Sequence, residues 1–389
     1  MNKIISSILK LLFKSIIILL LVICFFSSIL YLNTTIYNFP ESIPFKGNYI
    51  HNPYENLPLN TFKGNFHAHS IAWGNLTNGH NTEKEIYNEY NNREYDVIGI
   101  SNYHKISKYA KGLTDLYVPM YEHGYNIFKS HYLAINSNDV SYFDYPLFQF
   151  ISHKQKIIEN LKNKNVIIAM AHPKFGGGRT FEDMKRLVNY DLTEVLNHYR
   201  ISDKYWDEAL SSGRLTYIIG NDDTHDIHNE ATFKIWNNIF SNTRNIDSIL
   251  NNLKNGKSYA INSKNGICDN RLISCEIDSN DSNIFKIKFE NNVDKLEFIG
   301  QNGEIKKTIE NIDSGTYKFT EEDTYIRVVS RNENSDLYLN PLVKFDGKNI
   351  PLNSNLKPKS IFTLTWLFRL SIVTLIILLI YLIRKTIKY

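Results

Sequence analysis

The sequence contains few cysteines and lacks a glycine-rich phosphate loop. It has three cysteines in 389 residues, and Cys24 lies in an apolar run, so only Cys268 and Cys275 remain to pair. Two cysteines are too few for a disulfide framework, and whether they bond stays open. Gly176-Gly177-Gly178 matches neither the P-loop nor the dinucleotide pattern. These absences exclude a disulfide-stapled scaffold and argue against an open, nucleotide-binding sheet.

A basic surface is also missing, although the formal net charge is +4. Nine of the 44 basic residues lie before residue 15 or after residue 356, and neither tail holds an acidic residue. The portion between the tails therefore carries 35 basic against 40 acidic residues, a net charge of about −5. Nucleic-acid surfaces need clustered positive charge. We therefore expect no nucleic-acid partner.

Two long apolar runs lie near the ends of the chain. Ser15 to Leu32 has 18 residues without a charge, and Ile361 to Ile383 has 23 residues interrupted only by Arg369. Both approach the roughly 20 residues that span a bilayer. No small-residue cleavage site follows the first run, which favours an uncleaved anchor. For the second run, a helix lying in the membrane interface is the alternative, because a charge inside a span must snorkel or find a partner.

Basic residues lie just outside both runs, at the two ends of the chain. Lysine and arginine are enriched on the cytoplasmic side of membrane spans. We therefore expect a two-pass protein of the cell membrane, with both termini cytoplasmic and the middle of the chain extracytoplasmic.

Strand-like runs alternate with helical patterns from about residue 61. Thr82-Glu83-Lys84-Glu85, for example, is a capping box that opens a helix. Such repeated units predict an α/β domain with a parallel sheet or barrel. Short alternating runs separated by turns follow and predict a β-sandwich. The predicted parts are a tail with the first span (1–32), an extended linker (33–60), the α/β domain (61–267), the β-sandwich (268–356), and the second span with a basic tail (357–389).

Histidines and carboxylates come in short clusters, each at the end of a strand-like run. The clusters are His67-Ala68-His69, Tyr103-His104, Glu122-His123 followed by His131, Ala171-His172-Pro173, and Asp222-Asp223-Thr224-His225. Residues two apart in a strand point to the same side, so the two histidines of the first cluster can grip one ion. Imidazole and carboxylate suit zinc, iron or manganese. Because the C-terminal strand ends form the reactive rim of (β/α) barrels, this convergence favours a closed or nearly closed barrel.

These clusters resemble the motifs of the PHP (polymerase and histidinol phosphatase) superfamily. The matching segments are His67 to His69, Ser101 to His104, Glu122 with His131, Ala171 to Pro173, and Gly220 to His225. Tyr338-Leu339-Asn340-Pro341, at the end of the β-domain, looks like the carbaryl-esterase-type (CehA/McbA-like) group of metallohydrolases. The resemblance covers about residues 61–345. It implies a distorted (β/α)7 PHP-type barrel with two or three divalent metal ions.

The resemblance also implies roles for the matching residues. The residues implied in catalysis are His67, His69, Glu122, His172, Asp223 and His225. The first ion would be held by His67, His69, Glu122 and Asp223. Glu122 would bridge to a second ion held by His131 and His172. His104 and His225 would serve a third ion.

Two departures from the family pattern bear on the third ion. Asn102-Tyr103 precede His104 where the family usually has Thr-Asp, and the loop after the first motif has Asn78 and His80 where the family has an acidic residue or His before Gly. Asn78 is a poor ligand, and His80 is the substitute if the loop allows. A dinuclear site is therefore the expectation.

The predicted chemistry follows from the metals. A water that bridges two dications loses its proton near neutral pH and becomes a nucleophile. Lys174 and Arg179 follow His172 and are candidates to contact an anionic substrate, while Asp222 and Asp226 are candidates to orient ligating histidines. We therefore expect a metal-dependent hydrolase, first a phosphoesterase, acting on a small-molecule or envelope-derived ester. The alternatives are a carboxylic-ester or carbamate hydrolase on the same metals and a non-catalytic metal-binding envelope protein.

Overall fold

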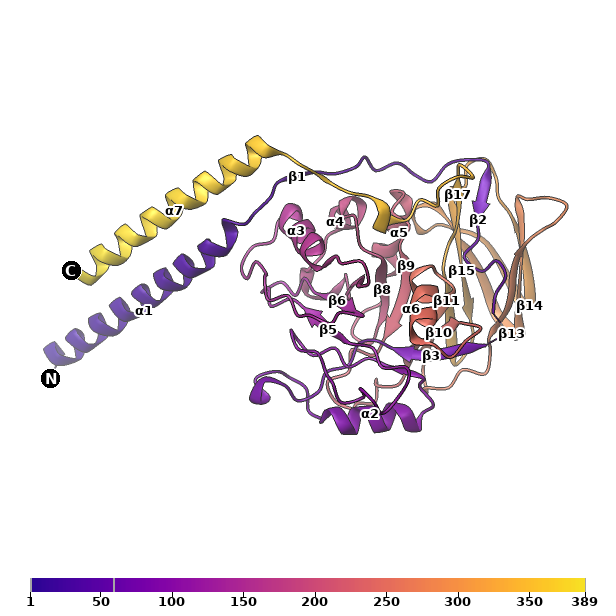
Figure 1. The fold of residues 1–389 in the computed structure, drawn as a ribbon, viewed down its shortest axis with the longest axis horizontal. Coiled ribbons are helices and arrows are strands. Elements are labelled where there is room, and N and C mark those ends of the chain that lie inside the picture. Colours follow the sequence, from indigo (N-terminus) through magenta and orange to yellow (C-terminus); the bar gives the residue numbers. More distant parts are fainter. Residues whose placement is uncertain (1, 59, 389) are drawn as a thin grey trace.

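The computed structural model describes residues 2–58 and 60–388. Two terminal helices, α1 (Asn2–Tyr31) and α7 (Phe362–Lys388), lie side by side and leave one side of a folded body (Figure 1). By length and composition, both are apolar enough to cross a membrane. They run antiparallel, since the Lys14 amine near one terminus donates to the carbonyl of Ile387 at 3.2 Å.

The ends of these helices nearest the body are tied to each other. The Arg369 guanidinium donates from Nε to the carbonyl of Thr34 at 2.9 Å. Just outside the helices, β1 (Tyr37–Asn38) pairs antiparallel with β18 (Lys359–Ser360). Arg369, the charge that interrupts the second apolar run, therefore has a hydrogen-bonding partner.

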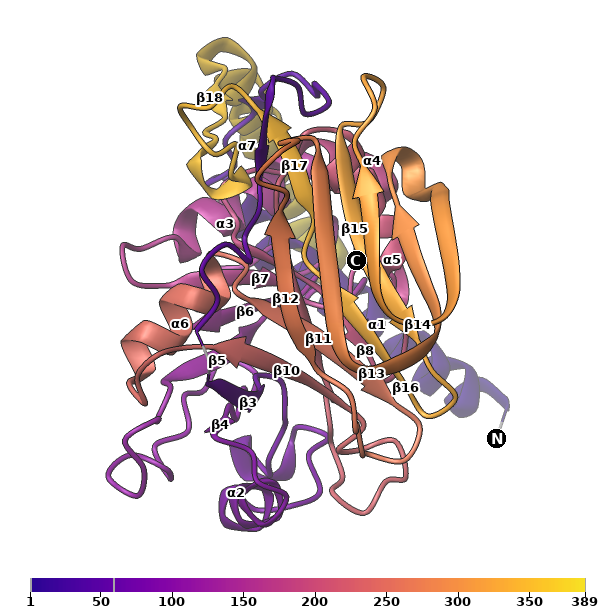
Figure 2. The same cartoon turned by 90° about the vertical axis from the view of Figure 1, so that its right-hand side faces the viewer.

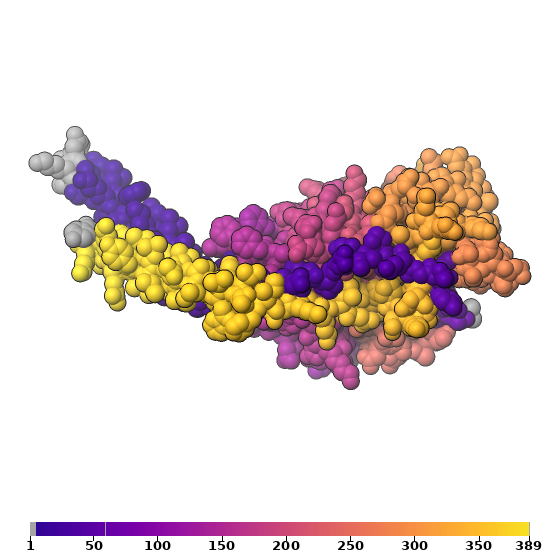
Figure 3. Space-filling view, turned by 90° about the horizontal axis from the view of Figure 1, so that it is seen from above, coloured from indigo at the N-terminus to yellow at the C-terminus, as the bar shows by residue number. Residues whose placement is uncertain are grey.

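The linker after the first helix lies on the body. Figure 3 shows this N-terminal segment running along the surface beside the C-terminal segment that leads to α7. The Arg214 guanidinium holds it there by donating to the carbonyls of Pro40 at 2.6 Å and Glu41 at 3.3 Å.

One large sheet has five strands in the order β5-β6-β7-β8-β9. Their bounds are Met120–His123, Tyr132–Ile135, Ile167–Met170, Leu192–Asn197 and Tyr217–Asn221. The last three are parallel, and β5, β6 and β7 pair antiparallel. Three helices lie between the later strands in sequence: α3 (Ile151–Leu161), α4 (Phe181–Arg186) and α5 (Asp203–Ser211). All residues of these strands are buried, as expected for sheets covered by helices.

The second large sheet has 11 strands, eight of them in the order β12-β13-β15-β16-β11-β10-β3-β4, with β14, β17 and β2 beside this path. Their bounds are, in chain order, Tyr49–His51 (β2), Thr61–Asn65 (β3), Val97–Ile98 (β4), Ile235–Phe240 (β10), Ser258–Ser263 (β11), Leu272–Ile277 (β12), Ile284–Ile299 (β13), Ile305–Lys318 (β14), Tyr325–Arg331 (β15), Ser335–Leu339 (β16) and Leu342–Phe345 (β17). Figure 2 faces the long strands of the C-terminal part. Since β11 pairs with β16, this sheet crosses the predicted boundary at residue 267, and the domain limits stay a prediction.

Two further helices, α2 (Glu83–Asn92) and α6 (Ile246–Lys254), follow β3 and β10 in sequence. The capping box predicted for the first of them is confirmed. The Thr82 hydroxyl accepts from the backbone N–H of Glu85 at 3.2 Å, and the Glu85 carboxylate accepts from the N–H of Thr82 at 2.7 Å.

The mixed α/β class is confirmed, but the described residues form no closed barrel. Strand β3 pairs with β10 on one edge and with β4 on the other, which leaves no edge for β9. Among the described residues, isolated backbone bridges link the segments after β3 and β4 to those of the five-stranded sheet, between Ala68 and Thr224 and between Tyr103 and Glu122. The sheets also pack on each other, since the Asn237 amide of β10 bonds the N–H and the carbonyl of Gly220 in β9 at 2.9 Å and 2.6 Å. The predicted (β/α)7 closure is therefore not found in the described residues, which form two sheets packed against each other.

Candidate metal centre

The end of the strands where the sheets meet also brings the polar clusters together. Backbone hydrogen bonds link consecutive segments: His69 N–H donates to Thr224 at 2.8 Å, Ser101 N–H to Ala68 at 2.8 Å, and Glu122 N–H to Ser101 at 3.0 Å. On the other side, Ala171 N–H donates to the carbonyl of His131 at 3.3 Å. Segments far apart in the chain are thus placed in one row, and their side chains face a common centre.

Four side chains form a first set of ligand atoms. His67 Nε2 lies 3.4 Å from Glu122 Oε2 and 3.1 Å from Asp223 Oδ1. His69 Nε2 lies 3.1 Å and 3.4 Å from the same two oxygens. Ligands about 2.1 Å from a tetrahedral zinc ion lie about 3.4 Å from one another. The spacing therefore fits a single divalent cation among these four side chains, the set that the sequence resemblance implied for the first ion.

A second set shares Glu122 through its other oxygen. Glu122 Oε1 lies 2.7 Å from His131 Nδ1 and 3.1 Å from His172 Nε2. Ligand atoms of these three residues all lie within 4.8 Å of one another. Glu122, which is fully buried, therefore presents one oxygen to each set and is placed to bridge two cations.

Unsatisfied buried atoms support this interpretation. The Nε2 atoms of His67, His69 and His225, together with Glu122 Oε2, are buried and have no hydrogen-bond partner among the described residues. Buried polar atoms in proteins are nearly always partnered. These atoms point into the cluster and are of types that bind divalent metal ions, so the cluster is a candidate site for such ions.

The charges in the cluster stabilise one another. Burial opposes ionisation of Glu122, but His131 and His67 lower its pKa well below the usual range. Burial likewise opposes protonation of His67, but the carboxylates of Asp223, Glu194 and Glu122 raise its pKa well above the usual range. The carboxylates are thus held ionised, which is the state that ligates a metal.

Two ligand positions have strained backbones. Asp223 has φ +50° and His172 has φ +27°, a region that residues other than glycine rarely adopt. Such strain collects at functional sites, where the surrounding structure over-determines the conformation. From these conformations, His172 reaches Glu122 and Asp223 reaches His67.

Glu194 is a functional residue that the sequence reasoning missed. It lies fully buried in β8, and its Oε1 accepts from His67 Nδ1 at 2.9 Å and from Asn221 at 2.8 Å. Its Oε2 accepts from His172 N–H at 2.8 Å and from Asn197 at 3.1 Å. A carboxylate on the far nitrogen of a ligating histidine fixes its tautomer and orientation. The available signal was an acidic residue inside an otherwise buried strand.

His104, which the resemblance implied as a ligand of a third ion, lies outside the groups of ligand atoms found among the described residues. Its Nδ1 lies 2.9 Å from the carbonyl of Ser141, and its Nε2 accepts from Gly124 N–H at 3.0 Å, so both nitrogens are engaged. The preceding residue, Tyr103, faces the cluster instead and stacks on His69 at 4.5 Å. Ligand atoms of His225 do lie within 4.8 Å of those of His69 and Asp223. Of the two residues implied for a third ion, only His225 therefore lies beside the other ligand atoms.

Asn78 and His80, the loop residues considered as ligands of a third ion, both lie at the surface. Asn78 is exposed, and the ring of His80 pairs with Asp226 at 3.6 Å. Asp226 therefore serves this exposed histidine rather than a ligand. The other candidate orienting residue, Asp222, accepts from the Tyr90 hydroxyl at 2.8 Å and from backbone N–H groups at the start of β10.

The two candidate substrate contacts differ. Arg179 is buried, donates to the carbonyl of His131 at 3.2 Å and lies over the ring of Tyr132. Its guanidinium is therefore engaged by the segment that carries His131. Lys174 is exposed in the loop after His172 and remains available.

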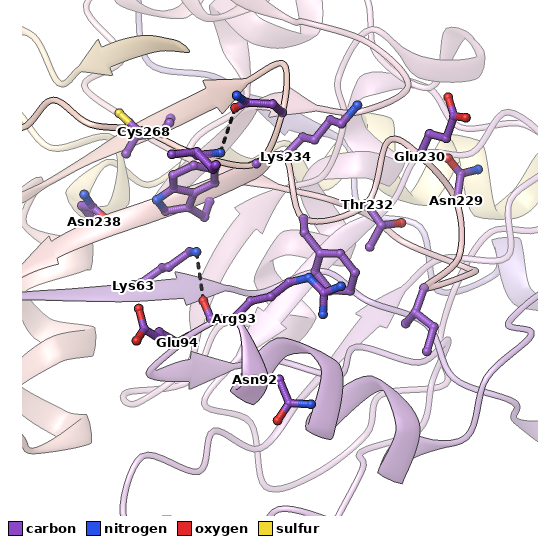
Figure 4. A pocket seen from close by; sticks show the side chains of 17 residues that line it. Lys63, Asn92, Arg93, Glu94, Asn229, Glu230, Thr232, Lys234, Asn238 and Cys268 are labelled. Carbon is purple, nitrogen blue, oxygen red and sulfur yellow. Dashed lines mark hydrogen bonds between the residues drawn. The ribbon is translucent and has the colours of Figure 1, made fainter. Parts of the chain in front are cut away.

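A cavity of about 780 Å³ lies away from the cluster and is lined from α2, β3, β10 and the segment after β11 (Figure 4). Lys63 is engaged within the cavity wall, since its amine donates to the carbonyl of Arg93 at 3.2 Å and lies over Trp236. None of the residues of the candidate metal cluster lines it. The three cysteines are free thiols, so Cys268 and Cys275 do not pair.

Comparison with known proteins gives little. No protein-family model matches the sequence, and no curated protein matches it. One solved structure that the chain resembles is a two-domain protein from Bacteroides vulgatus containing a predicted PHP-like metal-dependent phosphoesterase. It has 13% sequence identity and a TM-score of 0.41, and the match covers 83% of this chain and 99% of that one. With a likeness this distant, function must come from the site itself.

Proposed function

We propose that this protein is a membrane-anchored, metal-dependent hydrolase of the PHP type, with phosphoesterase activity. The observation that carries the proposal is the bridging position of Glu122, whose two oxygens each meet a separate set of imidazoles. A structural ion needs one closed set of ligands, whereas hydrolytic centres share a carboxylate between two ions. The backbone hydrogen bonds that join the strand ends around the cluster support a distorted PHP-type barrel that stays open between its sheets.

Two sets of residues would hold metal ions, and Glu194 orients one of the ligands. His67, His69, Glu122 and Asp223 would hold one divalent ion, and Glu122, His131 and His172 a second. Zinc, manganese or iron bound there would supply an activated water and positive charge for the attacked group. Glu194 keeps Nε2 of His67 directed inward by binding its Nδ1.

Aromatic rings pack beside the imidazoles of the centre. Tyr103 stacks on His69, Phe175 packs on His172 at 5.4 Å, and Phe175 also meets Tyr199. The Tyr199 hydroxyl lies 3.3 Å from His225 Nδ1, where it helps to orient that imidazole. These rings limit the water that reaches the centre, which strengthens its electrostatics.

We further propose that α1 and α7 form a two-helix anchor with both chain ends cytoplasmic and the body outside. The apolar stretches of both helices are almost wholly exposed, unlike a core helix. Lys3 and Lys10, and Arg384, Lys385 and Lys388, lie toward the ends farthest from the body, against Lys357 and Lys359 on the near side. This excess fits the positive-inside rule. Protease digestion of intact cells tests this: the body must be cleaved from outside, and its protection would contradict the proposed orientation.

The activity test uses the full-length protein in detergent with zinc, manganese or iron. Phosphomonoesters, phosphodiesters and aryl carboxylic esters are compared for wild type, Glu122→Gln and Asp223→Asn. Glu290→Gln, the same change on the exposed surface, is the control. Phosphoester turnover lost in the two site variants and kept in the control is expected. Turnover unchanged in both site variants would refute the proposal.

A carboxylic-ester or carbamate hydrolase is the second candidate, because Arg179 is occupied by the His131 carbonyl and does not face an anionic substrate. The same substrate panel separates the two. Tight metal binding with no turnover on any substrate would instead favour the non-catalytic alternative.

A further inference from the structure

The membrane helices join the body at the end of the strands that carries the metal ligands. Helix α3 precedes β7 in the chain, and His172 follows the C-terminal end of β7. Because a helix that leads into a strand through a short connection runs antiparallel to it, the N-terminus of α3 lies at the ligand end. Figure 1 shows α3, β5 and β6 on the side of the body from which α1 and α7 leave.

Specific contacts fix the hairpin to the segment before α3. The Tyr31 hydroxyl at the end of α1 donates to the carbonyl of Phe148 at 2.9 Å and accepts from its N–H at 2.7 Å. His153 of α3 lies 3.1 Å from the Thr34 hydroxyl and packs against Phe368 of α7. The point where the two helices would leave the bilayer is therefore in contact with this segment.

Exposed apolar side chains gather on the same segment and on the loop between β5 and β6. We call them the loop patch: Tyr125 (45% exposed), Ile127 (62%), Phe128 (45%), Tyr142 (61%), Phe148 (60%) and Phe150 (64%). The Asn126 amide joins the two segments by donating to the carbonyls of Tyr145 at 2.8 Å and Leu147 at 3.1 Å. Single exposed apolar residues are ordinary, but a contiguous group marks an interaction surface.

The loop patch also leads toward the metal centre. Phe128, Phe148 and Phe150 line a cavity of about 280 Å³, together with Ser130 and Gly177. Ser130 directly precedes His131, and Gly177 belongs to the loop that follows His172. Each ligand is thus one short segment away from this aromatic cavity.

We propose that the substrate is a lipid of the membrane that holds the anchor, with its ester-linked headgroup entering the metal centre while the loop patch rests in the membrane interface. Aromatic side chains favour that layer, and amphipathic surfaces bury their apolar residues in it. Helix α1 ends at Tyr31 and α7 begins at Phe362, both next to this surface. A bilayer that holds the two helices would therefore lie against the loop patch. This inference rests on the proposed hydrolase function.

The reaction balances with water as the sole co-reactant. For a phosphate ester, the water oxygen forms a bond to phosphorus while the bond from phosphorus to the leaving oxygen breaks. The leaving alcohol departs with a proton that originates from the water. No oxidant or other cofactor is required.

The experiment compares lipid and soluble substrates for the full-length protein. Vesicles containing equal parts of phosphatidylcholine, phosphatidylglycerol and phosphatidate are the lipid probe, and nitrophenyl phosphate esters are the soluble probe. The variant carries Phe128→Ser, Phe148→Ser and Phe150→Ser. Its control carries Ile267→Ser and Ile305→Ser, two exposed apolar residues of the C-terminal part.

The expected result is lipid turnover by the wild type that falls about tenfold or more in the triple variant, with soluble turnover changed less than about twofold. The control should match the wild type on both probes. Wild-type turnover of the soluble probe without any lipid turnover would overturn the inference and leave the proposed function standing. Equal loss on both probes in the triple variant would overturn it too. No turnover of either probe by the wild type would refute the function itself.

A second measurement does not depend on activity. Phe148→Trp and Ile305→Trp proteins are reconstituted in vesicles that contain brominated lipid, which quenches tryptophan at short range. Relative to wild type, added fluorescence at residue 148 should be quenched and that at residue 305 should not. Equal quenching at the two positions would contradict contact between the loop patch and the bilayer.

Discussion

The Glu194→Gln substitution tests whether Glu194 orients His67 in the candidate metal centre, and it leaves every proposed ligand in place. The carboxylate accepts four N–H groups, from His67, Asn221, His172 and Asn197. Glutamine has nearly the same shape but a single acceptor oxygen, so two of these buried donors would face an NH₂ group. Each unsatisfied buried donor costs about 1–3 kcal/mol.

The expected consequence for metal binding follows from His67. With its partner charge gone, the imidazole is free to change tautomer or rotate, and partner carboxylates of this kind contribute about 10- to 100-fold in metal affinity. That range corresponds to about 1.4–2.8 kcal/mol. Since the ligands themselves are intact, the variant should still bind metal, but more weakly.

The assay is a zinc titration against a competing chelator, carried out on full-length protein in detergent. Circular dichroism at the same temperature confirms that the variant is folded. Glu290→Gln, in which the same change is made beside Arg271 on the surface, provides the matched control. A folded Glu194→Gln protein with zinc affinity within about twofold of wild type would refute the assigned role.

Three further predictions follow from the site and the anchor. His104→Ala should leave the metal content unchanged, because both ring nitrogens are already engaged by Ser141 and Gly124; loss of a metal ion on elemental analysis would restore it as a ligand. Asp223→Ala should lower hydrolysis at least about 100-fold by opening the first ligand set, measured as kcat at saturating metal; near-normal kcat would contradict that set. Burial lowers the pKa of His153 from 6.5 to about 4, so its contribution to stability is present above pH 6.5 and is lost as pH falls toward 4, by up to about 3 kcal/mol. Thermal unfolding of His153→Gln should therefore depend less on pH in that window than wild type, and identical pH profiles would count against the burial argument.

Much of the candidate site can be predicted from the sequence, because a polar residue directly after an apolar run marks the end of a strand. His67 with His69, and Glu122, His172 and Asp223, each close an apolar run, and parallel strands place such ends together. The structure brings all five into one buried cluster. For these five residues, the position expected from the sequence matches the position in the structure, because each lies at the end of its own strand.

Other features depend on contacts that a linear pattern does not contain. His104 has the right residue type at a strand end, but a positive φ of +48° turns it toward Ser141, and Tyr103 takes the inward position. Glu194 acts through another residue, so no ligand spacing reveals it. The closed barrel fails because β10 occupies the edge of β3 that closure requires, and strand pairing at such long range is set by the whole sheet.

Elemental analysis of the purified full-length protein, compared with Glu122→Ala, tests the central claim most directly. We predict two divalent transition-metal ions per chain in the wild type and the loss of both from the variant, because one carboxylate joins both ligand sets. A wild-type protein that binds no such ion, or a Glu122→Ala protein that retains both, would contradict the account.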